Sequence, residues 1–226
     1  MLNTVIFDLD DTLYNEIDYC NSGFAAVASY ISKNLTTIDS TTIYKSLLAE
    51  FATSRTNVFN RTLENLNIAY DAAVIACLVK TYREHRPNIT LPADSLNTLK
   101  TLKKTYKLAL LTDGFMPAQR LKVDALNIVS YFECIVYSEE LGREFWKPST
   151  KGFEIILEKL NTAPKNAVYI ADNAEKDFLA PNKLAMPSIQ LKTSSQLHTS
   201  TAITPDYKAT YITTSITLLP EILKKL

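Results

Sequence analysis

Three acidic residues follow directly on a short apolar run near the start of the chain, and this feature constrains the fold most strongly. The run Thr4–Phe7 is β-branched and aromatic, which is typical of a buried strand, and Asp8, Asp10 and Asp11 come at its carboxyl end. Ligands of open α/β sheets bind outside the carboxyl ends of strands. Like charges this close repel, so a divalent cation, a lysine or a retained proton must offset them. We therefore interpret these carboxylates as part of an active site.

Size and composition describe an ordinary globular protein. The chain has 226 residues, 46% apolar and 21% charged, enough for one large domain or a core with an insertion. Its 24 basic and 24 acidic side chains give a formal net charge of zero, which does not indicate binding to a nucleic acid polymer or an anionic membrane. No signal peptide or apolar span of about 20 residues is apparent, and three widely spaced cysteines suggest reduced thiols. We expect a cytoplasmic protein, either a monomer or a homodimer.

Strand-like runs alternate with helical patterns over most of the chain. Helical spacings of apolar residues follow the later strands, as in Leu121, Ala125 and Ile128, and again after a helix start expected at Lys147-Pro148. The predicted strands are Thr4–Phe7, Lys107–Leu111, Cys134–Tyr137, Ala167–Ala171, Ser188–Leu191 and Thr210–Thr213. This alternation predicts an α/β fold with a Rossmann-like parallel sheet and helices on both of its faces.

The stretch between the first two predicted strands has no strand alternation. Phe24, Val27, Ala28 and Ile31 share one helical face, and two further helices are expected behind possible caps at Ser40 and Asp71. A helix from about Ala93 to Lys104 leads back to the sheet. We predict a catalytic core formed by residues 1–14 and 91–226, with an all-helical cap, residues 15–90, inserted after the first strand. Such caps exclude water and select substrate.

Three later polar clusters lie where predicted strands end or helices begin. Thr112-Asp113-Gly114 can offer a hydroxyl and free backbone N–H groups to an oxyanion. Lys147 can neutralise phosphate or carboxylate charge. Asp172 and Asp177 suit a hard cation such as Mg²⁺, which prefers oxygen ligands. Each cluster alone has an ordinary structural explanation, as a turn, a helix start or a cap, but their order and placement together favour one site.

With these four clusters in order, the chain resembles the haloacid dehalogenase-like hydrolase superfamily, and specifically its phosphatases with a helical cap between the first two motifs. The resemblance implies a Rossmann-like core, Mg²⁺ dependence and phosphoryl transfer through an aspartyl phosphate. It implies that Asp8 is the nucleophile and Asp10 the general acid and then base. It also implies that Asp8, the backbone oxygen of Asp10, and Asp172 hold the metal. The supporting residues it implies are Asp177 and Asn173, and the phosphate-binding residues are Thr12, Thr112, Asp113, Gly114 and Lys147.

Two residues depart from the family pattern. Asp113 stands where many relatives have asparagine, which adds negative charge near the phosphate unless its side chain turns away. Ala171 precedes the metal aspartate where glycine is usual. Neither change removes a catalytic group. We further expect neighbouring negative charge to raise the pKa of Asp10 and favour its protonated form before attack.

The predicted function is a Mg²⁺-dependent phosphatase that hydrolyses a small phosphorylated metabolite, a phosphosugar or a nucleotide monophosphate. A dehalogenase would need neither a metal nor Asp10 as an acid. A phosphomutase of the same superfamily uses the same residues, and release of free phosphate separates the two activities. A receiver-like signalling module or a non-catalytic binding protein are alternatives from other classes. The receiver alternative is disfavoured by the length, the insertion and Asp10.

The motifs indicate the substrate only as a class: Ala171-Asp172-Asn173 with Lys176-Asp177-Phe178 is similar to phosphatases of carbohydrate or nucleotide metabolism. Tyr19, Arg55 and Arg61 of the predicted cap are candidates for contacts with substrate, but each could equally serve the surface or the core. His85 and His198 are solitary, and we assign them no role.

Overall fold

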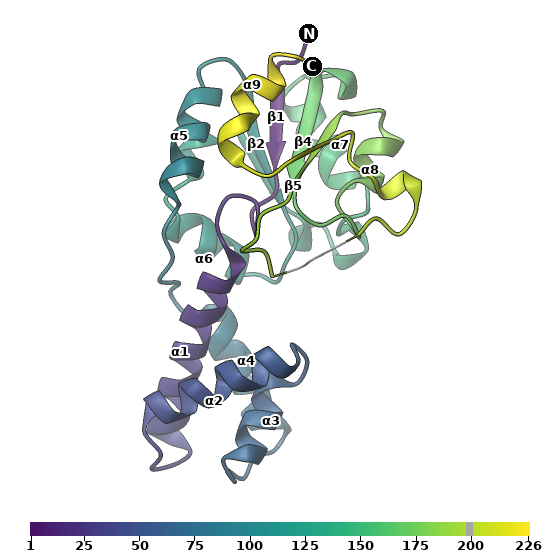
Figure 1. The fold of residues 1–226 in the computed structure, drawn as a ribbon. Helices are drawn as coiled ribbons and strands as arrows, with labels where there is room; N and C mark the ends of the chain where they lie inside the picture. Colours follow the sequence, from purple (N-terminus) through teal and green to yellow (C-terminus); the bar gives the residue numbers. More distant parts are fainter. Residues whose placement is uncertain (198–200) are drawn as a thin grey trace. The chain divides into compact units, whose positions relative to one another are not determined.

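The computed structural model describes residues 1–197 and 201–226, so His198 lies outside the described residues. The chain divides into two compact units (Figure 1). We call Met1–Glu16 with Thr90–Leu226 the core unit, and Ile17–Ile89 the helical unit. The boundaries predicted from sequence, after residues 14 and 90, lie close to these. That the helical unit acts as a cap over the site stays a prediction.

A six-stranded sheet forms the centre of the core unit, with strand order β3-β2-β1-β4-β5-β6 and every neighbouring pair parallel. The strand bounds are β1 Thr4–Phe7, β2 Lys107–Thr112, β3 Cys134–Tyr137, β4 Ala167–Ala171, β5 Ser188–Leu191 and β6 Tyr211–Thr213. The predicted parallel sheet is confirmed. Strand order reverses at β1, so β1 and β4 flank a topological switch point, where α/β sheets bind ligands.

Helices cover both faces of this sheet, as predicted. Figure 1 shows α5 and α6 on one side of the strands and α7 and α8 on the other. The helices of the core unit are α5 Ala93–Leu102, α6 Ala118–Ala125, α7 Lys151–Lys159, α8 Leu179–Lys183 and α9 Leu219–Leu223. Single 3₁₀ turns occur at Val129–Tyr131, Ser138–Glu140, Arg143–Phe145, Pro164–Asn166, Pro205–Tyr207 and Ile216–Leu218.

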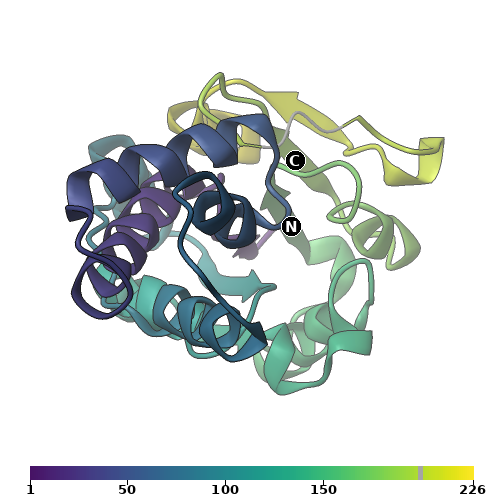
Figure 2. The same ribbon diagram turned by 90° about the horizontal axis from the view of Figure 1, so that it is seen from below.

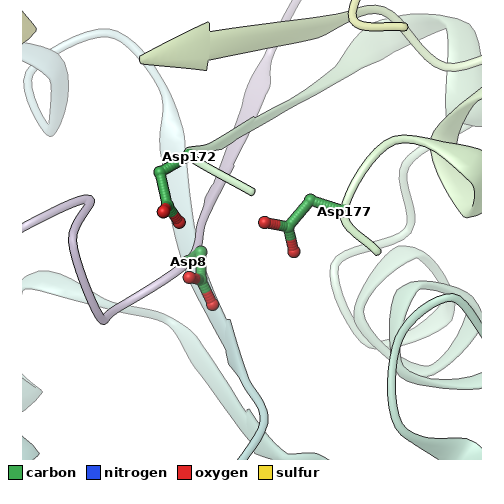
Figure 3. A group of neighbouring side chains, drawn as sticks. All are labelled: Asp8, Asp172 and Asp177. Atoms are coloured by element: carbon green, nitrogen blue, oxygen red, sulfur yellow. The ribbon is translucent and has the colours of Figure 1, made fainter. Parts of the chain in front are cut away.

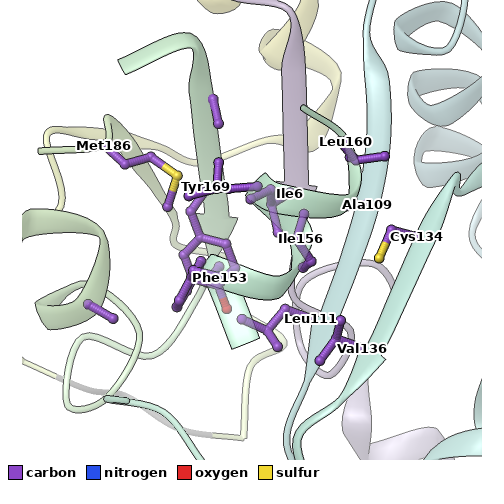
Figure 4. Packing of buried hydrophobic residues seen from close by; sticks show 14 of the residues in the cluster. Ile6, Ala109, Leu111, Cys134, Val136, Phe153, Ile156, Leu160, Tyr169 and Met186 are labelled. Atoms are coloured by element: carbon purple, nitrogen blue, oxygen red, sulfur yellow. The ribbon is translucent and has the colours of Figure 1, made fainter. Parts of the chain in front are cut away.

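Apolar side chains from alternate strand positions fill both sides of the sheet. On the α7 side, Ile6 of β1 and Tyr169 of β4 pack with Phe153 of α7 (Figure 4). The rings of Phe153 and Tyr169 are perpendicular, with centroids 4.8 Å apart. On the other side, Phe7 meets the edge of Phe132 at 6.5 Å. Each fully buried side chain of this size stabilises the fold by about 1.5–3 kcal/mol, so the strand that carries Asp8 is held rigidly.

The start predicted for α7 is wrong. The helix begins at Lys151, not at Lys147-Pro148. A residue before proline is disfavoured in helical conformation, and the backbone N–H of Ser149 closes a turn onto the carbonyl of Trp146 at 2.9 Å. Lys147 therefore lies in a loop that precedes the helix.

The helical unit contains four helices, α1 Glu16–Asn34, α2 Ser40–Thr53, α3 Val58–Asn65 and α4 Ala72–Glu84, of which α1 starts at the last residue of the core unit. The stripe predicted on α1 is buried. Asp71 caps α4 as predicted, because its carboxylate accepts a hydrogen bond from Val74 N at 2.9 Å. The cap predicted at Ser40 is wrong: Asp39 caps α2 by accepting from Thr42 N at 3.0 Å.

The carboxyl-terminal strand β6 forms one edge of the sheet and is drawn in yellow in Figure 2. It is three residues long, and Tyr211 and Ile212 are exposed. Cys20, Cys77 and Cys134 are free thiols, as expected. Among the helices of the described residues, none combines the length and the apolar character that crossing a bilayer requires.

Candidate active site

The ends of β1 and β4 bring together carboxylates that are far apart in sequence. Phe7 pairs with Leu110 on one side and with Ile170 on the other. The next residue, Asp8, extends the ladder by donating its backbone N–H to Ile170 O at 2.9 Å. Asp172 follows β4 directly, one position beyond the residue in register with Asp8. Figure 3 shows the carboxylates of Asp8, Asp172 and Asp177 facing one another.

These three carboxylates form a buried group with the geometry of a cation site. Asp8, Asp172 and Asp177 each offer one oxygen, and the three oxygens lie within 4.8 Å of one another. All three residues are buried. Oxygen atoms of carboxylates are the ligands that Mg²⁺ prefers, and crowded like charges need such a counterion. The donor set therefore fits a magnesium ion.

Lys147 reaches this group from the loop before α7. Its Nζ lies 2.6 Å from Asp8 Oδ1 and 2.8 Å from Asp177 Oδ1, and it donates to the phenol oxygen of Tyr169 at 3.0 Å. The Tyr169 hydroxyl in turn lies 3.2 Å from Asp177 Oδ1. One ammonium thus contacts two of the three carboxylates, and a second lysine, Lys176, pairs with the nearby Asp113 at 3.7 Å.

The pKa values of the site follow first from burial and then from the neighbouring charges. Burial raises the pKa of Asp8 to about 6, with Lys147 opposing the shift and Asp177 adding to it. Burial, followed by the charges of Asp8, Asp177 and Asp11, raises the pKa of Asp172 to about 9. For Lys147, burial disfavours the charged form, but the carboxylates of Asp177 and Asp8 outweigh it and raise its pKa well above the usual value. At neutral pH Asp8 is therefore ionised and Lys147 is charged.

The Asp10 carboxylate has partners of its own, and the expected direction of its pKa shift is wrong. Its Oδ1 accepts from Tyr14 OH at 2.5 Å and from Lys122 Nζ at 2.8 Å, and its Oδ2 accepts from Gln119 Nε2 at 2.9 Å. Burial alone would raise the pKa of Asp10, but the Lys122 ammonium and these hydrogen bonds outweigh burial and lower it. The prediction took into account the neighbouring acids but not Lys122.

The three acids after β1 therefore have three different environments. Asp8 belongs to the carboxylate group, and Asp10 contacts α6. Asp11 adopts a left-handed conformation, φ 53°, and its carboxylate accepts from the backbone N–H of Glu16 at 2.8 Å and of Leu197 at 2.7 Å. Asp11 thus ties the loop after β1 to the start of α1 and to the segment after β5.

The predicted phosphate-binding residues after β2 have partners of their own. Thr112 Oγ1 is buried and accepts from Gln119 Nε2 at 2.6 Å. Asp113 Oδ1 accepts from Ser138 Oγ at 2.7 Å, and both of its oxygens lie within 3.3 Å of the backbone nitrogen of Lys147. The acid that replaces the usual asparagine therefore holds the loop that carries Lys147.

Three further predicted residues are placed as follows. Gly114 has φ 139°, and a Cβ there would lie 2.7 Å from the Gln119 side chain, so only glycine fits easily. Asn173 donates its backbone N–H to Asp177 Oδ2 at 2.9 Å and thereby orients that carboxylate. Thr12 lines a different cavity of the core unit, about 300 Å³, with residues near the ends of β5 and β6. The structure gives Thr12 no described contact with Lys147 or Thr112.

The candidates predicted in the helical unit serve that unit's own packing. Arg61 pairs with Glu50 at 2.7 Å, the Tyr19 hydroxyl donates to the carbonyl of Tyr82 at 3.1 Å, and Arg55 lies over the ring of Phe51. None of these contacts indicates a substrate.

Several side chains that contact the predicted site residues were not predicted, among them Tyr14, Gln119, Lys122, Ser138 and Tyr169. The helix predicted from the spacing of Leu121 and Ala125 is confirmed as α6, but both residues are only partly buried, whereas Gln119 and Lys122 are buried. A glutamine and a lysine three positions apart give no apolar signal. Their spacing on one helix face, shortly after Thr112, is the sole clue in the sequence.

Comparison with known proteins identifies the family. The model of the haloacid dehalogenase-like hydrolases matches residues 5–191. A glyceraldehyde 3-phosphate phosphatase of Methanopyrus kandleri is 28% identical over 199 residues, which cover 85% of this chain and 84% of that one. A Bacillus subtilis HAD-hydrolase solved with bound magnesium superposes with a TM-score of 0.68 at 20% identity, covering 98% of both chains.

A 2-haloacid dehalogenase of Pseudomonas syringae pv. Tomato DC3000 has the same TM-score, 0.68, at 20% identity, covering 100% of this chain and 99% of that one. Likeness at this level shows the fold and does not separate dehalogenation from phosphoryl transfer. The family match confirms the resemblance, the fold class and the hydrolase class predicted from the motifs. The chain belongs to the haloacid dehalogenase-like hydrolases.

Proposed function

We propose that this hydrolase is a Mg²⁺-dependent phosphatase that cleaves a small phosphorylated sugar through a phosphoryl group held on Asp8. One observation carries the proposal: the Asp8 carboxylate lies within 4.8 Å of two further carboxylates and 2.6 Å from the Lys147 ammonium. A cation and a lysine beside one carboxylate are what the attack of an anion on a phosphate dianion requires.

Asp8, Asp172 and Asp177, together with the backbone oxygen of Asp10, would hold the magnesium ion. When bound, the ion would neutralise phosphate oxygens and align them with the nucleophile. The raised pKa values of Asp8, about 6, and Asp172, about 9, support this assignment, because carboxylates that are costly to ionise together are stabilised by a divalent cation.

The chain's own residues account for both chemical steps. In the first, an Asp8 oxygen forms a bond to phosphorus, the ester P–O bond breaks, and Asp10 gives a proton to the leaving alkoxide. The incoming phosphate adds negative charge near Asp10 and shifts its pKa upward, which favours the proton it must donate. In the second, water attacks phosphorus and gives its proton to Asp10, and the bond to Asp8 breaks.

Lys147 would offset charge on the transferring group throughout both steps, since Asp177 and Tyr169 fix its ammonium beside Asp8. Thr112 and the backbone around Gly114 would add hydrogen bonds to the phosphate oxygens. Asp113 would act by holding the Lys147 loop, because its carboxylate accepts from the Lys147 backbone nitrogen.

A sugar phosphate is the preferred substrate class because a relative that matches most of this chain is named a glyceraldehyde 3-phosphate phosphatase. Glyceraldehyde 3-phosphate is therefore the first substrate to test, followed by larger phosphosugars and nucleotide monophosphates. We place the enzyme in the cytoplasm, as a monomer or homodimer without a nucleic acid or membrane partner.

The test measures release of inorganic phosphate from this panel with magnesium and with a chelator. We expect activity only with the metal, and the Asp8→Asn variant should release no phosphate and retain no label from ³²P-labelled substrate. Full activity in Asp8→Asn would refute the nucleophile. An isomeric phosphosugar without free phosphate would show a mutase instead, and equal rates on sugars and nucleotides would remove the sugar preference.

A further inference from the structure

The carboxylate of Asp10 is held by three donors that the motifs of the family do not include. Tyr14, Gln119 and Lys122 donate to it over 2.5 Å, 2.9 Å and 2.8 Å. The Lys122 side chain is 5% exposed and that of Asp10 18%. A lysine of this burial is rare unless its charge is paired, and here Asp10 is its ion-pair partner.

The two α6 residues of this set act on different atoms. Lys122 and Gln119 are three positions apart on α6, so they share one face of the helix. Lys122 binds Oδ1, whereas Gln119 binds Oδ2 and also Thr112 Oγ1 at 2.6 Å. Because both oxygens have donors, Oδ1 from Lys122 and Tyr14 and Oδ2 from Gln119, the plane of the carboxylate is fixed as well as its position.

We propose that Lys122 and Gln119 are positioning residues, which hold the Asp10 carboxylate where it exchanges protons with the leaving group and with water. The inference rests on the proposed function and deepens it. A carboxylate that must act twice, on two different oxygen atoms, gains from a fixed orientation, and small misplacements of a reacting group cost up to about 100-fold in rate. Gln119 also couples this orientation to Thr112, a predicted phosphate-binding residue.

The test compares two substrates of Lys122→Met. With 4-nitrophenyl phosphate the leaving anion is stable without a proton, so Asp8 should still be phosphorylated rapidly while attack by water is slowed. We expect a burst of nitrophenolate of about one per enzyme, followed by turnover reduced about 10–100-fold. With glyceraldehyde 3-phosphate both steps need Asp10, so the rate should fall at least as far and without a burst.

Arg120→Met is the matched control, because Arg120 lies on the same helix but pairs with Glu140 at the surface. It should behave as the wild type with both substrates. If Lys122→Met does not yield folded protein, as judged by circular dichroism and thermal unfolding, Gln119→Leu gives the same test. It removes the donor to Asp10 Oδ2 and should show the same burst.

These experiments distinguish a failure of the positioning role from a failure of the proposed phosphatase function. A folded variant that loses the same fraction of activity on both substrates, with no burst, would overturn the positioning role and leave the proposed function standing. A wild-type protein without phosphatase activity, or an active Asp8→Asn variant, would overturn the proposed function and this inference with it.

Discussion

Magnesium binding should depend steeply on pH, because the ligands must lose protons that burial makes them keep. In the metal-free protein the pKa of Asp172 is raised to about 9 and that of Asp8 to about 6. At pH 7.5 Asp172 is then almost fully protonated and Asp8 almost fully ionised, so binding of Mg²⁺ should release about one proton. At pH 6, Asp8 is half protonated, and the number of protons released on magnesium binding rises to about 1.5.

The size of the effect follows from these numbers. One released proton corresponds to about a tenfold change of affinity per pH unit, or about 1.4 kcal/mol. Between pH 6 and pH 8 the two carboxyl groups together should strengthen magnesium binding about 100–200-fold. Since both pKa values are raised in the folded state, the metal-free protein should also lose stability as pH rises toward 9, and magnesium should restore it.

Isothermal titration calorimetry in HEPES and in Tris measures the released protons, because the two buffers differ in ionisation enthalpy. Melting temperatures with and without magnesium, between pH 6 and 9, test the second expectation. Asp124→Asn removes an exposed carboxylate of α6 and should leave both results unchanged. Proton release near zero at pH 7.5, with an affinity that stays flat from pH 6 to 8, would refute Asp172 as a buried, protonated ligand.

Three further substitutions test separate contacts. Tyr169→Phe removes the hydroxyl between Lys147 and Asp177, so kcat/KM should fall about tenfold while the circular dichroism spectrum stays unchanged. An unaltered kcat/KM would mean that Tyr169 contributes only to packing. Asp113→Asn removes one of the two oxygens that accept from the Lys147 backbone nitrogen and breaks the ion pair with Lys176, so kcat/KM for the phosphosugar should fall a few-fold in steady-state assays. An unchanged kcat/KM would contradict the role of Asp113 in holding the loop. Gly152→Ala places a Cβ 2.5 Å from a methyl of buried Leu111, and this crowding costs about 1–3 kcal/mol of unfolding free energy, against about 1 kcal/mol gained in helix propensity. Urea unfolding should therefore show a net loss of about 1 kcal/mol. A more stable variant would contradict the tight packing described for this position.

The strands were predictable because burial leaves a direct mark on composition. β1, β3, β4 and β5 have the predicted bounds, because strands covered on both faces are mostly apolar, and β1 and β4 end directly before an aspartate. Helix details were harder to predict. Asp39 and Ser40 are both good capping residues, and adjacent candidates cannot be separated by type.

The carboxylate group was predictable in outline, but the surroundings of Asp10 were not. Asp8 and Asp172 follow strands directly, so their meeting follows from strand order. Lys122 is one of 24 basic side chains, and nothing local distinguishes a buried lysine from an exposed one. The direction of the Asp10 pKa was therefore wrong, because that direction depends on a partner 112 positions away.

The position of β4 beside β1 has a consequence for biosynthesis. Lys147 contacts Asp8 across 139 positions, and Asp172 lies further along the chain, so an emerging polypeptide carries the proposed nucleophile before these counterparts leave the ribosome. Until then the amino-terminal aspartates lack the environment that shifts their acidity and gathers a cation. We therefore expect chains that stop before Asp172 to be inert toward phosphate esters, because the proposed nucleophile then lacks its neighbours in the folded site.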